Sequence, residues 1–148
     1  ILLLSTCLGL IRNIFLNEPL ELIKKTRILN KVYSIPELML EPLAIDISFA
    51  KNLYDNKKAI FLDARDKEDF KEGHIFDAIN IPYDDVEEYE NIILQLNSDF
   101  PVVIYCSGGE CDLSAILGYL LYNDYIFSYV LIFESGYPDW VNNGYPVE

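Results

Sequence analysis

The sequence holds few residues of the kinds that bind metals or form disulfide frameworks. It has one histidine, His74, and three cysteines, none of which pair in a C-x-x-C spacing. Protein zinc sites need three or four such ligands, so we expect no metal site. The cysteines are also too few for the dense, even set of small secreted domains that depend on disulfides.

Positive charge is scarce in most of the chain. The net charge is −13, and it is unevenly distributed: residues 1–31 hold five basic and two acidic residues, whereas residues 32–148 hold six basic and 22 acidic ones. An acidic surface repels the phosphates of nucleic acids and does not attract anionic substrates over long range. We therefore exclude DNA and RNA as partners.

Apolar residues are abundant, at 51% of 148 residues, which is enough for the core of one domain. Short apolar runs alternate with helical patterns, which predicts an α/β fold with a mostly parallel sheet covered on both faces. The pattern predicts strands at residues 45–47 (a strand or turn), 59–65, 78–82, 102–105 and 128–133. It predicts helices at residues 48–56 (capped by Ser48), 66–71, 84–96 and 113–121, and a last one after Gly136.

The first 16 residues are almost wholly apolar, with Arg12 and Asn13 as breaks. They are short of the ~20 residues that span a bilayer. Because the chain begins with Ile1 rather than Met, we interpret residues 1–16 as a hydrophobic helix from a truncated membrane anchor. The end of a signal peptide and an amphipathic helix packed on the domain are the alternatives. Cys7 is expected to act as a small apolar residue there.

A basic linker follows at residues 17–33, and the folded domain is expected at residues 34–148. The linker holds Lys24, Lys25, Arg27 and Lys31. Basic residues beside a membrane segment favour a cytoplasmic domain and attract anionic lipid, so we expect the membrane as a partner.

The most informative stretch surrounds Cys106. Four apolar residues, 102–105, predict a buried strand, and the chain then passes Cys106, Gly108 and Gly109 before a helix that Asp112 is placed to cap. The carboxyl end of a strand is where open α/β sheets place their ligand sites. Backbone N–H groups of such a loop, together with the helix dipole, stabilise a thiolate. Cys106 is thus a candidate nucleophile, although a free cysteine can also simply fill core space.

Three separated pieces of the sequence resemble the rhodanese superfamily over residues 45–148. The first runs from Phe61-Leu62-Asp63-Ala64-Arg65 through Gly73-His74-Ile75 to Ala78-Ile79-Asn80-Ile81-Pro82, and the second is the Cys106 loop. The third joins Gly136-Tyr137-Pro138-Asp139-Trp140 to Gly144-Tyr145-Pro146-Val147. Their order and spacing together are typical of the family.

The resemblance implies a three-layer α/β/α domain with a mostly parallel sheet of about five strands. In catalytic relatives the loop cysteine accepts a sulfane sulfur as a persulfide and passes it to a nucleophile. Cys106 is the matching position, and no cofactor or metal is needed. The negative charge of the outer sulfur needs a cradle of N–H groups. The expected cradle is formed by the backbone N–H groups of Ser107, Gly108, Gly109, Glu110, Cys111 and Asp112.

The loop departs from the thiosulfate-using members of the family. These carry basic residues beside the cysteine and an arginine or lysine five positions later, where this chain has Ser107 and Cys111, with acidic Glu110 and Asp112 nearby. Each acidic group at short range costs an anionic donor on the order of 1 kcal/mol. We therefore expect a polysulfide, a persulfide or a partner protein's thiol as the sulfur source. The Cys-Ser-Gly-Gly-Glu-Cys form resembles a subgroup that often follows a membrane segment.

Cys111 leaves other interpretations open. It could form a disulfide with Cys106 in a redox site, or resolve a Cys106 persulfide with release of sulfide, or be a small buried side chain. Disulfide formation needs Cα atoms within about 7 Å. A rhodanese-like module that only binds a partner is a further alternative. A phosphatase of related fold needs an arginine where this chain has Asp112, and we reject it.

The other distinctive residues have expected structural roles. Asp63 and Arg65 are predicted to form a buried polar pair that supports the loop after their strand. His74 is expected to order its turn by local hydrogen bonds rather than to act in catalysis, and Trp140 to cover the core. Tyr105 is expected to pack within its strand, and Tyr137 to line the mouth of the site.

Overall fold

Five parallel strands form one sheet in the computed structural model, which describes residues 34–148. The strands are β1 (Leu43–Ile45), β2 (Ile60–Asp63), β3 (Ile79–Asn80), β4 (Val102–Tyr105) and β5 (Val130–Phe133). Their order across the sheet is β1-β5-β4-β2-β3, and every neighbouring pair is parallel. The central β4 and its neighbour β5 are buried at every residue, as a sheet covered on both faces requires.

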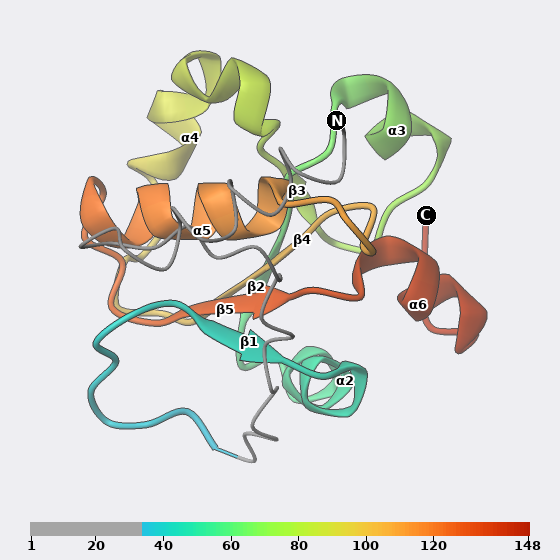
Figure 1. Ribbon diagram of the computed structural model, residues 1–148, viewed down its shortest axis with the longest axis horizontal. Coiled ribbons are helices and arrows are strands. Elements are labelled where there is room, and N and C mark those ends of the chain that lie inside the picture. Colours follow the sequence, from blue (N-terminus) through green and yellow to red (C-terminus); the bar gives the residue numbers. More distant parts are fainter. Residues whose placement is uncertain (1–33) are drawn as a thin grey trace, which may run out of the picture.

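Helices cover both faces of the sheet (Figure 1). They are α2 (Ile47–Asp55), α3 (Lys67–Glu72), α4 (Glu90–Ile93), α5 (Leu113–Asn123), α6 (Gly136–Asn142) and the 3₁₀ helix η1 (Tyr83–Tyr89). α4 and α5 lie on one side of the sheet and α2 on the other. The three-layer α/β/α fold with five strands is therefore confirmed.

The alternation of side chains along β4 builds two cores. Val103 and Tyr105 point into the core that α2 and Trp140 cover. Val102 and Ile104 point the opposite way, into the core under α5, and Cys106 continues on that side. The cysteine at the strand end thus lies on the α5 side of the sheet.

The prediction of one helix over residues 84–96 was wrong. The chain forms η1 and then only four residues of α4, with a kink at Asp85 (φ −113°). Acidic side chains crowd this segment, and like charges at helical spacing destabilise an α-helix. Lys67 of α3 forms exposed ion pairs with Asp85 and Glu88, which join α3 to η1.

Other element boundaries shift by a few residues. The strand expected at residues 45–47 is β1, which ends at Ile45, and the cap of α2 is Asp46 rather than Ser48. The Asp46 carboxylate accepts the N–H of Phe49 at 2.8 Å. Asp112 occupies the N-cap position of α5 but makes no side-chain capping hydrogen bond.

The predicted membrane anchor (residues 1–16, with Cys7) and the basic linker (residues 17–33) lie outside the described residues. Within residues 34–148, none of the helices has the length and apolar character needed to cross a bilayer.

Candidate active site

Cys106 directly follows the central strand β4, at the carboxyl edge of the sheet (Figure 1). Its neighbour Tyr105 lies opposite Asp63 of β2 and Phe133 of β5 in the strand register. Three chain segments therefore meet around Cys106: the corner after β2, the loop before α5 and the turn after β5. Ligand sites of open parallel sheets form at this edge.

Two glycines shape the Cys106 loop. Gly108 (φ +71°) and Gly109 (φ +64°) both adopt the left-handed conformation that favours glycine. The N–H of Cys111 donates to the carbonyl oxygen of Gly108 at 3.1 Å, so the loop folds back on itself. A Cβ on Gly108 would lie 2.2 Å from the carbonyl oxygen of Ser135, whereas Gly109 faces open space.

The turn after β5 closes against the Cys106 loop. Sequence reasoning placed Tyr137 of this turn at the mouth of the site but missed the contact of Gly136. The N–H of Tyr137 donates to the carbonyl oxygen of Cys106 at 2.9 Å. Gly136 (φ +64°) approaches so closely that a Cβ there would lie 2.2 Å from the same oxygen. In the sequence, Gly136 is visible only as a glycine a few residues after a predicted strand, and this pattern does not indicate which loop it contacts.

The Cys106 sulfur has two polar contacts. It lies 3.3 Å from the carbonyl oxygen of Cys111 and 3.5 Å from the hydroxyl oxygen of Ser114. Both oxygens can accept the S–H of the thiol, and the Ser114 hydroxyl can instead donate to a thiolate. Cys106 is fully buried, with an exposed fraction of 0%.

Ser114 was also missed as a site residue. It lies in the first turn of α5 and is buried. Its signal in the sequence is a single hydroxyl inside an apolar helix, just after the cysteine loop. A serine in that place is compatible with ordinary helix packing, so only the fold reveals its contact with Cys106.

Cys111 lies partly exposed over the loop. Burial raises the pKa of the Cys111 thiol, and its interaction with the Cys106 thiol raises that pKa further. The backbone N–H groups of Leu113 and Ser107 interact with the Cys111 sulfur and oppose these effects. The structure therefore brings the two thiols together.

The expected cradle of N–H groups around Cys106 stays a prediction. In the described conformation the N–H of Ser107 interacts with the Cys111 sulfur, and the N–H of Cys111 donates to Gly108. Glu110 and Asp112 are exposed on the same loop. Residues 72–148 contain no lysine or arginine, so the loop and the turn after β5 carry no basic side chain.

Asp63 and Arg65 form a buried pair at the end of β2. The Asp63 carboxylate accepts the N–H of Arg65 at 2.9 Å and its guanidinium at 2.6 to 3.1 Å. The guanidinium also donates to the carbonyl oxygen of Gly73 at 2.8 Å and lies 4.3 Å from the ring centroid of Tyr137. Burial would lower the pKa of Arg65, but the hydrogen bond and charge of Asp63 outweigh it and raise that pKa.

The hydroxyl of Tyr105 supports the same corner. It accepts the N–H of Ile75 at 3.1 Å, and burial, followed by the charge of Asp63, raises the pKa of Tyr105. The phenol therefore remains neutral, and Tyr105 joins β4 to the segment after α3.

His74 and Trp140 lie in structural settings. Both ring nitrogens of His74 are engaged, Nδ1 with the carbonyl oxygen of Phe70 at 2.8 Å and Nε2 with the Glu148 carboxylate at 3.1 Å. Trp140 is fully buried, and its indole N–H donates to the carbonyl oxygen of Pro146 at 2.9 Å. These contacts fasten residues 146–148 to the domain.

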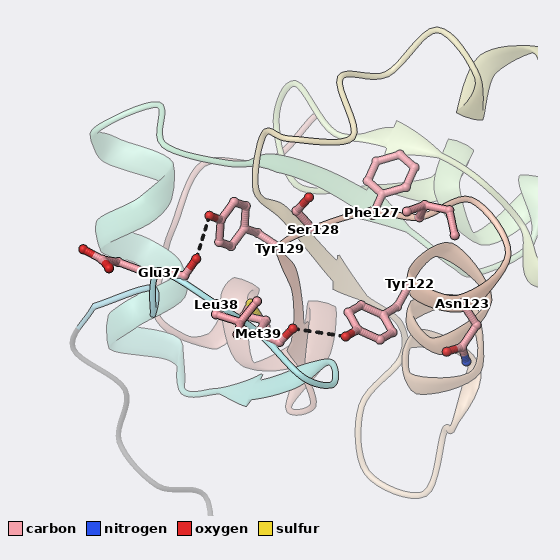
Figure 2. A pocket seen from close by; sticks show the side chains of 9 residues that line it. Glu37, Leu38, Met39, Tyr122, Asn123, Phe127, Ser128 and Tyr129 are labelled. Atoms are coloured by element: carbon pink, nitrogen blue, oxygen red, sulfur yellow. Dashed lines mark hydrogen bonds between the residues drawn. The ribbon is translucent and has the colours of Figure 1, made fainter.

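A surface pocket of about 470 Å³ lies at the other end of the sheet (Figure 2). It is lined by residues before β1 and by the segment joining α5 to β5. The hydroxyls of Tyr122 and Tyr129 donate to the carbonyl oxygens of Met39 and Glu37, each at 3.1 Å. Because Tyr129 precedes β5 and Cys106 follows β4, the pocket and the cysteine loop occupy opposite ends of parallel strands.

Known proteins share both sequence and fold with this chain. A probable molybdopterin-synthase adenylyltransferase of Porphyra purpurea is 30% identical over 130 residues, which cover 86% of this chain and 31% of that protein. A tRNA uridine(34) hydroxylase of Photorhabdus laumondii is 32% identical over 77 residues, covering 49% of this chain and 21% of that protein. The chain thus spans only about a third or less of these relatives.

Solved structures resemble the described domain. The BH2092 protein of Bacillus halodurans matches with a TM-score of 0.59 and 25% identity, over 71% of this chain and 75% of that one. A rhodanese-related protein of Thermoplasma volcanium matches with a TM-score of 0.54 and 27% identity, over 73% of this chain and 97% of that one. The family model for the rhodanese-like domain matches residues 47–143, more than half of the chain. The chain therefore belongs to the rhodanese-like domain family.

Proposed function

We propose that this chain carries or transfers sulfane sulfur, with Cys106 as the nucleophile that forms a persulfide. The supporting observation is the position of Cys106 at the carboxyl end of the central strand of a rhodanese-like domain. A thiolate there attacks a sulfane sulfur, and the bond between that sulfur and its former carrier breaks. The displaced carrier takes the electron pair, and the outer sulfur remains on Cys106 until an acceptor nucleophile removes it.

Two features near Cys106 can stabilise negative charge on its sulfur. The Ser114 hydroxyl, 3.5 Å from the sulfur, can donate to it once the proton has left. α5 begins at Leu113, so the positive end of its dipole lies at the end of the helix that carries Ser114 and faces the Cys106 loop. The carbonyl oxygen of Cys111 opposes this effect, since it favours the protonated thiol.

The loop must open before a donor reaches the sulfur. Cys106 is fully buried, and residues 109 and 110 of its loop are exposed. Exposed residues of this kind have few contacts that oppose motion. We propose that the sulfur donor binds to the opened loop.

The proposed donor is a polysulfide, a low-molecular-weight persulfide or the persulfide of a partner protein. Glu110 and Asp112 lie on the loop, and residues 72–148 supply no basic side chain. Each carboxylate at short range costs a dianion such as thiosulfate on the order of 1 kcal/mol. A donor of lower charge avoids most of this cost.

Sulfur transfer from two donors tests the proposal. The chain carrying Cys111→Ser, in which the second loop thiol cannot take the sulfur, is incubated in mild detergent with inorganic polysulfide or with thiosulfate, and sulfur transfer to cyanide is measured. We expect transfer with polysulfide, much weaker transfer with thiosulfate, and none above background for Cys106→Ser. Unchanged transfer by Cys106→Ser would reject Cys106 as the carrier, and a preference for thiosulfate would reject the charge argument.

We also propose that the apolar residues 1–16 tether the domain to a membrane, with the domain on the cytoplasmic side because of the basic residues that follow. The test is whether the full chain stays with the membrane fraction at high salt and alkaline pH. Release into the supernatant would contradict the tether.

A further inference from the structure

The two thiols of the loop are arranged as neighbours. The Cys106 sulfur lies 3.3 Å from the carbonyl oxygen of Cys111, and the two side chains interact. The turn closed by the hydrogen bond from Cys111 to Gly108 brings residue 111 back over the strand end. Cys106 is buried and Cys111 is partly exposed, so only the second thiol is open to solvent.

We propose that Cys111 is a resolving thiol, which attacks the persulfide of Cys106 and releases its outer sulfur as hydrosulfide. This inference rests on the proposed function, because it needs a persulfide on Cys106. It adds a reduction to sulfur carriage: the chain would convert bound sulfane sulfur into sulfide.

The step balances in atoms and electrons. The Cys111 thiolate attacks Sγ of Cys106, and a bond forms between the two cysteine sulfurs. The bond from Cys106 to the outer sulfur breaks, and that sulfur leaves with the electron pair and the persulfide proton as hydrosulfide. The sulfane sulfur is reduced by two electrons, and the two cysteines are oxidised to a disulfide. Two equivalents of a small thiol, or one dithiol, then reduce the disulfide and restore the site.

The geometry favours this intramolecular acceptor over external ones. An acceptor from solution must reach a sulfur with an exposed fraction of 0%, whereas Cys111 already lies beside it. Holding a nucleophile next to its target gives it a high effective concentration. Burial and the Cys106 thiol raise the pKa of the Cys111 thiol, and the N–H groups of Leu113 and Ser107, which interact with its sulfur, partly offset this rise.

A disulfide between the two thiols would need some adjustment of the loop. Bridged cysteines require Cα atoms within about 7 Å and a defined torsion. Gly108 and Gly109 stand between Cys106 and Cys111, and a Cβ on Gly109 would meet nothing within 4 Å. Gly109 is therefore the residue of the loop at which such an adjustment is easiest.

The test follows one loading of sulfur without reductant. Full chains carrying Cys7→Ser, so that two thiols remain, are treated with inorganic polysulfide and freed of excess reagent. Released hydrosulfide and intact mass are then followed over time. We expect one hydrosulfide per chain and a final mass two hydrogens below that of the reduced chain. The same chain with Cys111→Ser should retain one added sulfur and release hydrosulfide only at the background rate.

The outcomes separate this inference from the proposed function. Sulfur retained equally long with and without Cys111 would overturn the resolving role and leave the carrier intact. If neither chain gains or releases sulfur, the resolving role of Cys111 and the proposed carrier function of Cys106 are both overturned. The chain with both thiols tests the resolving role by itself: release of hydrosulfide with loss of two hydrogens supports it, and retained sulfur contradicts it. A folding defect in Cys111→Ser would therefore not change the conclusion.

Discussion

Two central strands end side by side at the same edge of the sheet, and the chain builds their ends in opposite ways. After β2, Asp63 and Arg65 form a buried charged pair with four hydrogen bonds between them. After β4, the Cys106 loop is held by backbone hydrogen bonds of 2.9 and 3.1 Å and by two longer sulfur contacts. The first corner is a fixed support, and the second is a loop that can open for chemistry.

The comparison predicts the largest loss of stability at the β2 corner. Arg65→Ala leaves the buried carboxylate of Asp63 without its charged partner, which costs about 3–5 kcal/mol of unfolding free energy. Urea denaturation measures this cost. Asp55→Asn, which breaks the exposed pair with Lys51, is the matched control and should cost less than about 1 kcal/mol. Similar costs for both variants would contradict the supporting role of the pair.

Gly136→Ala should produce the next largest effect, because it disrupts the contact between the turn after β5 and the Cys106 loop. The residue needs a positive φ and has no room for a Cβ beside the carbonyl oxygen of Cys106. We expect a cost of about 2–4 kcal/mol and faster alkylation of Cys106. Gly144→Ala is the control, since Gly144 has a similar φ but open space, and it should cost about 1 kcal/mol. Equal costs would show that the turn does not close on the loop.

Much of the fold could be predicted from the sequence because its signals are local. Apolar runs mark β2, β4 and β5, and Asp66 and Gly73 bound α3 as expected. The acidic segment does not form one helix: it is interrupted at Asp85, and its crowded acidic side chains oppose a continuous α-helix.

The site was only partly predictable from the sequence, because some of its residues are defined by contacts between segments and not by a local pattern. Cys106 and Cys111 were found because a thiol after a buried strand and a second thiol five residues later are visible in the chain. Ser114 and Gly136 were missed because their roles arise from contacts between segments. Neither residue type is unusual in its local sequence.

Ser114→Ala should have a smaller and more selective effect. It removes the hydroxyl 3.5 Å from the Cys106 sulfur, so the thiolate loses one hydrogen-bond donor. We expect persulfide formation to slow about fivefold, equivalent to a hydrogen bond of about 1 kcal/mol. Stopped-flow loading with polysulfide measures the rate, and Ser128→Ala, at a partly exposed serine that donates to Asp99 far from Cys106, is the control. Equal loading rates for the unsubstituted chain, Ser114→Ala and Ser128→Ala would exclude a contribution from Ser114.

The smallest expected change is a shift in the titration of Cys111. Its pKa is raised by burial and then by the Cys106 thiol, so the thiolate forms only at higher pH than in a free cysteine. Cys106→Ala removes the second cause, and the pH midpoint of Cys111 alkylation should fall, while burial, the largest cause, keeps it from falling far. A rise of the midpoint would show that Cys106 instead stabilises the Cys111 thiolate.

The central claim is that Cys106 carries the sulfur, and two full-length chains with a single thiol test it most directly. One chain keeps only Cys106 and the other only Cys111, with serine at the remaining cysteine positions. After treatment with inorganic polysulfide and removal of excess reagent, intact mass is measured. The structure predicts one added sulfur on the chain with Cys106 and none that persists on the chain with Cys111. A sulfur atom retained only by the chain with Cys111 would contradict the account.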